Sequence, residues 1–208
     1  MAKLPENISV TIQAKGTVIK VPSQKQLEQQ FQPYAVELGK LVFAWNQLHE
    51  KLAGLFWAIT GFKNGAMASA IWYSTDNERT QRKMLRQLAE VVFSGDNKKK
   101  DGILWLVKQV DDALAGHRND AIHAPLNFMT GPFGTVLEPS WYSGSPRAKS
   151  LAGKDLMSEF KWYRERADVF ATYAAKIHAA LLLPDRRWPE IPALPPKPKR
   201  HGSGKPAQ

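Results

Sequence analysis

The chain contains no cysteine and no long apolar run. Without cysteine there are no disulfides, no thiolate metal sites and no cysteine nucleophiles, and the composition fits a reducing compartment. No stretch of the sequence is long and apolar enough to span a bilayer. Residues 1–12 lack the apolar centre of a signal peptide. We therefore expect a cytoplasmic protein with no membrane partner.

Several common catalytic signatures are missing as well. The glycines are scattered through turns and do not form a phosphate-binding loop, and there is no Gly-x-Ser-x-Gly elbow. His49-Glu50 does not begin a zinc-binding His-Glu-x-x-His pattern, because position 53 is alanine. The other carboxylates do not form a metal-binding cluster, so we expect neither a metal nor another cofactor.

Acidic residues are in deficit. Lysine and arginine number 29 against 19 aspartates and glutamates, which gives a net charge of +10 and a pI near 9.8. A basic surface favours polyanions such as RNA or DNA. A soluble protein with a basic tail would show the same balance. The length of 208 residues suits one domain with appendages.

The spacing of apolar residues predicts a mainly α protein. Residues 8–12 and 17–21 alternate as in a β-hairpin, so residues 1–23 form an N-terminal appendage. Residues 24–183 then follow a helical period. We expect a four- to five-helix antiparallel bundle with its helices at about 33–60, 64–93 with a break near Ser74-Thr75-Asp76, 100–123 and 155–183.

Two regions lack that period. Residues 124–154 are rich in glycine and proline and predict a long loop after the third long helix, which is unusual in a compact domain and often functional. Its aromatic residues could equally cover the end of the bundle. Residues 184–208 are rich in proline and lysine, so we expect a disordered tail.

One short run stands out for chemistry: Arg118-Asn119-Asp120-Ala121-Ile122-His123, at the end of the third predicted helix. It contains the only arginine of the chain that is followed by a histidine five to seven positions later. A histidine can move protons near neutral pH. An arginine can hold a phosphate and stabilise the charge that develops on it. The run could instead be a helix end, with Arg118 paired to an aspartate and His123 capping the last carbonyls.

This run resembles the motif of the HEPN superfamily, which are small helical bundles whose Arg-x4-6-His motif, often with asparagine after the arginine, marks a ribonuclease site. The resemblance implies metal-independent RNA cleavage in a cleft formed by a homodimer. It assigns His123 as general acid or base, Arg118 as the phosphate-holding residue and Asn119 as the residue that orients either one. It also implies a toxin–antitoxin or antiphage role, with a cognate antitoxin or regulator as a further partner.

Other polar residues are candidates for contacts with the substrate. HEPN-like proteins often place a further polar residue on another helix, and Asn46 or Glu50 could serve. Arg79 and Arg82 belong to a basic stripe at helical spacing that could guide an RNA backbone. A solvated helix face explains both sets equally well.

Two other functions remain open at this point. A catalytically inactive HEPN-like module would bind RNA or a protein through the same dimer cleft. A general nucleic-acid-binding bundle would depend mainly on its basic tail.

Overall fold

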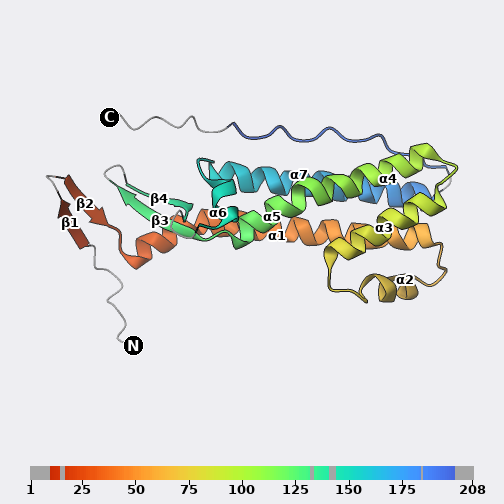
Figure 1. Cartoon of the computed structure of the whole chain (residues 1–208), viewed down its shortest axis with the longest axis horizontal. Coiled ribbons are helices and arrows are strands. Elements are labelled where there is room, and N and C mark those ends of the chain that lie inside the picture. Colours follow the sequence, from red (N-terminus) through yellow and green to blue (C-terminus); the bar gives the residue numbers. More distant parts are fainter. Residues whose placement is uncertain (1–9, 15–16, 132–133, 141–143, 184, 200–208) are drawn as a thin grey trace. The chain divides into compact units, whose positions relative to one another are not determined.

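The computed structural model describes residues 10–14, 17–131, 134–140, 144–183 and 185–199. It confirms a mainly helical chain with a small N-terminal antiparallel sheet, and it shows a second two-stranded sheet that the sequence did not predict (Figure 1). Within these ranges, no helix combines the length and the apolar character that crossing a membrane requires. The elements, in chain order, are β1 (Val10–Ala14), β2 (Thr17–Val21), α1 (Gln24–Thr60), α2 (Gly65–Trp72), α3 (Glu78–Val92), α4 (Asn97–Gln109), the π-helix η1 (Val110–Leu114), α5 (Ala115–His123), β3 (Leu126–Gly131), β4 (Gly134–Pro139), α6 (Pro146–Leu151) and α7 (Leu156–Leu182).

The chain divides into two compact units. The first unit comprises residues 1–39, 119–160 and 198–208, and the second comprises residues 40–118 and 161–197. The predicted division at residues 23 and 183 follows the sequence in order, whereas these units each gather distant segments. The boundaries at residues 23 and 183 therefore stay a prediction.

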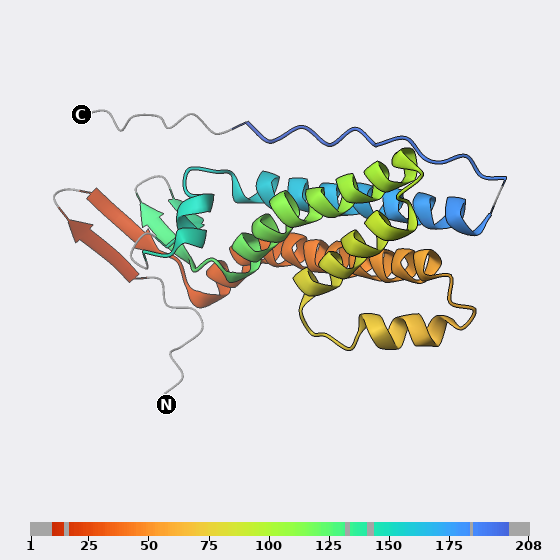
Figure 2. The same cartoon turned by 45° about the vertical axis from the view of Figure 1, so that its right-hand side comes forward.

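In the second unit, the long helices α1, α3, α4 and α7 lie side by side (Figure 1, Figure 2). Most of the apolar residues that recur at helical spacing in the sequence form its core, because residues spaced three and four apart share one face of a helix. Those of this unit that are buried are Leu41, Trp45, Leu48, Leu52, Leu55, Ile59, Leu85, Ile103, Val107, Val110, Tyr163, Ala167, Phe170, Ala174 and Ile177. The spacing also predicts Val91 and Val92 to point inward, and this is wrong, since they are 74% and 48% exposed.

The predicted break in the second helical region is confirmed, since α2 ends at Trp72 and α3 begins at Glu78. The residue that caps α3 is Asn77, just after the predicted Ser74–Asp76 stretch. Its side-chain oxygen accepts a hydrogen bond from the backbone N–H of Thr80 at 3.1 Å.

The first helix begins earlier than predicted, at Gln24 in place of residue 33. Ser23 and Gln26 form a capping box: the Gln26 side chain accepts from the Ser23 N–H at 2.8 Å, and the Ser23 hydroxyl accepts from the Gln26 N–H at 3.4 Å. This cap starts the helix, and Pro33 is accommodated inside it.

The prediction of one long loop over residues 124–154 is wrong. In the first unit β3 and β4 pair as an antiparallel hairpin, with Leu126 opposite Pro139 and Gly131 opposite Gly134, and α6 follows. Phe128 packs edge-to-face against Phe31, with ring centres 6.4 Å apart. Apolar burial therefore orders a segment whose glycines and prolines indicated a loop.

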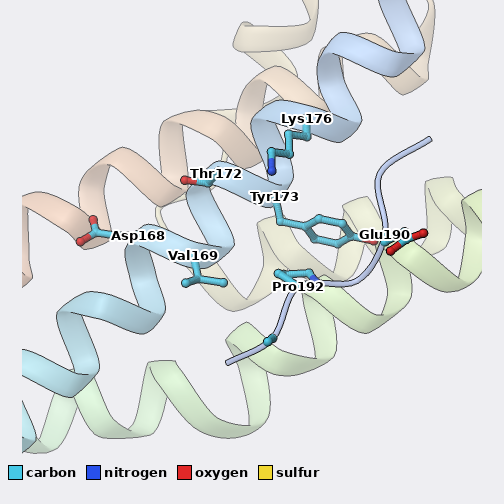
Figure 3. Close-up of a pocket in the computed structure, with 8 residues that line it drawn as sticks. Asp168, Val169, Thr172, Tyr173, Lys176, Glu190 and Pro192 are labelled. Atoms are coloured by element: carbon cyan, nitrogen blue, oxygen red, sulfur yellow. The ribbon is translucent and has the colours of Figure 1, made fainter. Parts of the chain in front are cut away.

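The predicted disorder of the tail does not describe residues 185–197, which lie along helices of the second unit. The indole nitrogen of Trp162 donates to the Pro195 carbonyl at 2.9 Å. Figure 3 shows Tyr173 pointing from α7 toward the extended segment that carries Glu190 and Pro192. These three residues help to line a cavity of about 260 Å³. Residues 184 and 200–208 lie outside the described residues.

Candidate functional site

A buried tryptophan of the second unit gathers several charged side chains around it. Trp45 on α1 is 1% exposed, and its indole nitrogen donates to a Glu78 carboxylate oxygen at 3.0 Å. The ring of His49 lies 4.8 Å from the Trp45 ring. The guanidinium carbons of Arg82 and Arg118 lie 5.9 and 5.5 Å from the Trp45 ring centre, within the range of cation–π attraction. We call Trp45, His49, Glu78, Arg82, Asp111 and Arg118 the Trp45 cluster.

Four members of the Trp45 cluster are placed in two pairs by helix geometry. Trp45 and His49 are four residues apart on α1, and Glu78 and Arg82 are four apart on α3, so each pair shares a helix face. Asp111 comes from the π-helix η1, which interrupts the predicted helix over residues 100–123. A π-turn changes the helical phase, and such turns occur frequently at functional sites.

Arg82 is held inside the protein by carboxylates. Its side chain is 4% exposed, its Nε donates to Asp111 Oδ1 at 2.6 Å, and its Nη1 lies 3.9 Å from Glu78 Oε2. The sequence suggested a stripe that guides RNA across a surface. Arg79 is exposed as that interpretation requires, whereas Arg82 is engaged in a buried ion pair.

His49 is a neutral imidazole in this setting. Burial lowers its pKa from 6.5 to about 4; Arg82 and Arg118 act in the same direction, and Glu78 opposes them. Arg82 Nη1 lies 3.4 Å from His49 Nε2. A guanidinium can only donate, so a hydrogen bond there requires the lone pair of Nε2.

The two predicted polar candidates on α1 differ in their surroundings. Asn46 is exposed. Glu50 is also exposed and accepts a hydrogen bond from the Tyr73 hydroxyl at 2.9 Å. Partial burial raises the pKa of Tyr73, and the hydrogen bond to Glu50 raises it further. Glu50 also contributes to the electrostatics of His49, which connects it to the Trp45 cluster.

The Arg–His motif lies on α5, and the division between the units passes through it. Arg118 belongs to the second unit, where it joins the Trp45 cluster, while Asn119 and His123 belong to the first unit. Asn119 is half-buried and His123 is exposed at the last residue of the helix. Asp120, the acidic residue inside the motif, accepts a hydrogen bond from the Ser150 hydroxyl.

An apolar pocket of about 370 Å³ lies in the first unit beside the motif histidine. Its lining includes Ile122 and Ala124, the two chain neighbours of His123, and the aromatic rings of Phe31 and Phe128. The flat faces of nucleobases stack on such side chains. The pocket is therefore a surface that an unpaired base could occupy.

His117, next to the motif, has a packing role. Its ring stacks on Tyr163 with centres 4.7 Å apart and planes 3° from parallel, and it also contacts Trp162. The packed histidine and the motif histidine are therefore different residues.

Sequence reasoning missed three members of the Trp45 cluster: His49, Glu78 and Asp111. The four-residue spacing from Trp45 to His49 and from Glu78 to Arg82 could have indicated shared helix faces. Nothing in the sequence, however, indicates that these faces meet or that Asp111 reaches Arg82.

Among the side chains that the structure describes, no three or more histidines, aspartates and glutamates form a group that could hold a metal ion. The cluster instead offers arginine guanidinium groups, a neutral histidine and carboxylates, a set suited to binding an anion and exchanging a proton. Comparison with family models, curated proteins and solved structures finds no match to this chain.

Proposed function

We propose that the protein is a metal-independent endoribonuclease of the HEPN type, a four- to five-helix antiparallel bundle that acts as a homodimer. The observation that carries the proposal is the position of Arg118, whose guanidinium lies over Trp45 beside a neutral histidine. Packing on the indole restricts the side chain before a ligand arrives, and a preorganised cation stabilises a charged transition state best.

The reaction follows from the chemistry of RNA and the motif residues. The ribose 2′-hydroxyl attacks the adjacent phosphorus while a base removes its proton. The bond to the 5′ oxygen breaks, and an acid protonates that oxygen, which leaves a 2′,3′-cyclic phosphate and a 5′-hydroxyl. His123 serves as general base or general acid, Arg118 holds the phosphate, and Asn119 orients one of them.

The net charge of +10 supports a polyanionic substrate. Exposed Arg79, Asn46 and Glu50 are the residues through which the second unit would contact more of the RNA. Arg82 acts as a structural support for the cluster because its charge is matched by Asp111. A cytoplasmic toxin or antiphage component, controlled by an antitoxin or regulator, is the role that we assign to such an enzyme.

A second candidate is a catalytically inactive HEPN-like module that binds RNA or a protein. The observation in its favour is the presence of Glu78 and Asp111 among the arginines, because carboxylates weaken the attraction for a phosphate. Such a module would show salt-dependent affinity for RNA without cleaving it.

The test is cleavage of a mixed RNA pool by purified protein in EDTA, beside Arg118→Ala and His123→Ala. The enzyme should cleave in EDTA, and both variants should lose cleavage while they keep the fold. Arg79→Ala is the matched arginine control and should change affinity more than turnover. RNA binding without cleavage by the wild type would favour the inactive module instead.

A further inference from the structure

The Trp45 cluster contains a histidine for which the proposed mechanism has no task. The side chain of His49 is 15% exposed, so solvent and a small group can reach part of the ring. It lies against Trp45, the same tryptophan that carries the Arg118 guanidinium. The indole therefore presents one cationic and one titratable side chain together.

The two carboxylates of the cluster differ in how many neighbours they contact. Asp111 binds Arg82 at 2.6 Å. Glu78 divides its charge among the Trp45 indole at 3.0 Å, His49 at 3.7 Å and Arg82 at 3.9 Å. A carboxylate spread over three neighbours holds no single one of them tightly. Glu78 alone therefore does not keep His49 charged, and an anion bound nearby would add to its effect.

We propose that Arg118 and His49 together bind the phosphodiester group of a nucleic acid, and that this binding adds a proton to His49. The proposal rests on the proposed function for the class of ligand. His49 is then a positioning residue that becomes cationic only when the phosphate is present. Its Nε2 takes up the proton, gives up the hydrogen bond from Arg82 at 3.4 Å and can donate to Glu78, 3.7 Å away.

The direction of the proton transfer follows from the groups that face His49. Arg82 on α3 and Arg118 on α5 disfavour the imidazolium, while Glu78 on α3 and Glu50 on α1 favour it. A phosphate bound at Arg118 cancels one positive charge and adds a negative one nearby. Burial is the largest cause of the low pKa of His49, and we expect the added negative charge to outweigh any further burial by the ligand. The pKa of His49 then rises on binding, and by linkage the ligand binds more tightly as the pH falls.

A short oligodeoxythymidylate is the appropriate probe. It lacks the 2′-hydroxyl, so it cannot be cleaved, and neither its phosphodiesters nor its bases titrate between pH 5 and 8. If the bound histidine has a pKa about two units higher than the free one, the affinity should rise about tenfold from pH 8 to pH 5. His49→Gln should bind with a much weaker pH dependence, because glutamine cannot take up the proton.

His178→Gln is the matched control. His178 is also a half-buried histidine of the second unit with a pKa lowered by burial, but it packs against Trp57. This variant should keep the full pH dependence of binding. An equal loss in both variants, or an unchanged dependence in His49→Gln, would overturn the assignment.

A titration of the His49 ring by NMR needs no folded variant. In the wild-type protein its resonances should titrate at a higher pH when the oligodeoxythymidylate is saturating. An unmoved titration, or no binding at any pH, overturns the proposal. A shift caused by sulfate in a protein that does not bind the oligonucleotide would overturn the assignment to nucleic acid, because the site would then serve small anions.

The inference and the proposed function fail separately. Proton-linked binding without RNA cleavage would contradict the nuclease and leave the phosphate site standing. Cleavage that depends on Arg118 and His123, with no proton uptake at His49, would contradict the role of His49 and support the nuclease.

Discussion

The buried ion pair between Arg82 and Asp111 gives the most quantitative prediction. Replacing Asp111 with alanine leaves a guanidinium that is 4% exposed without its 2.6 Å partner. Breaking a fully buried pair costs about 3–5 kcal/mol. Here Asp111 is 23% exposed and Glu78 remains 3.9 Å from the guanidinium. We therefore expect a loss of about 2–3 kcal/mol in the free energy of unfolding, or about 4–12 °C in melting temperature for a chain of this size.

Urea denaturation followed by tryptophan fluorescence is the assay, since most of the tryptophans belong to the second unit. Asp111→Asn keeps a hydrogen-bond acceptor and should lose about half as much. Exposed Asp112 is the matched control, and its alanine variant should stay within about 0.5 kcal/mol of the wild type. If Asp111→Ala matches the wild type as closely as Asp112→Ala does, the ion pair does not stabilise the cluster.

Two further predictions concern packing and pH. A Cβ added at Gly102 would lie 2.9 Å from the Tyr173 hydroxyl and 3.1 Å from the Trp188 indole nitrogen; Gly102→Ala should therefore cost about 1–3 kcal/mol and increase proteolysis of the tail after residue 185. At Gly116 an added Cβ would meet no atom within 4 Å beyond its chain neighbours and the backbone of its own helix, so Gly116→Ala should be neutral or stabilising by up to about 1 kcal/mol. Equal effects of both changes would contradict the packing of the tail. The pKa of His49 is lowered from 6.5 to about 4, so the unfolded chain takes up a proton that the folded chain does not. Its contribution to stability is complete above pH 6.5 and should fall by about 3 kcal/mol as the pH decreases to about 4; denaturation at several pH values should show this slope reduced in His49→Gln, and an equal slope in both proteins would refute the prediction.

The helices were predictable from the sequence where apolar spacing is regular. The stripe from Leu41 to Ile59 is buried throughout, because burial against neighbouring helices is what such spacing reflects. The start of α1 lies well before the apolar stripe that begins at Leu41, so that stripe alone does not locate it. The Ser23–Gln26 capping box is the local signal in the sequence that marks this boundary.

The hairpin of β3 and β4 and the π-helix could not be predicted in the same way. Glycine and proline at residues 131, 132 and 134 of the sequence indicate a loop, whereas packing such as Phe128 on Phe31 favours the strands. A π-turn inserts one residue into a helix. Here the π-helix carries Asp111, which forms a tertiary ion pair with Arg82 that the local sequence does not indicate.

The candidate site was predictable only in part. Arg118, Asn119 and His123 follow from a motif within one helix, and the structure confirms that helix. The setting of Arg118 does not follow from any motif, because Trp45, His49 and Glu78 come from two other helices. Residues that meet through packing leave no fixed spacing in a sequence.

The most direct test of the nuclease assignment is the chemistry of the RNA ends after incubation in EDTA. The account predicts fragments with 2′,3′-cyclic phosphate and 5′-hydroxyl ends from the wild-type protein, and none above background from Arg118→Ala or His123→Ala. Intact RNA with the wild type, or the same fragments from the variants, would contradict the assignment of this motif as a ribonuclease site.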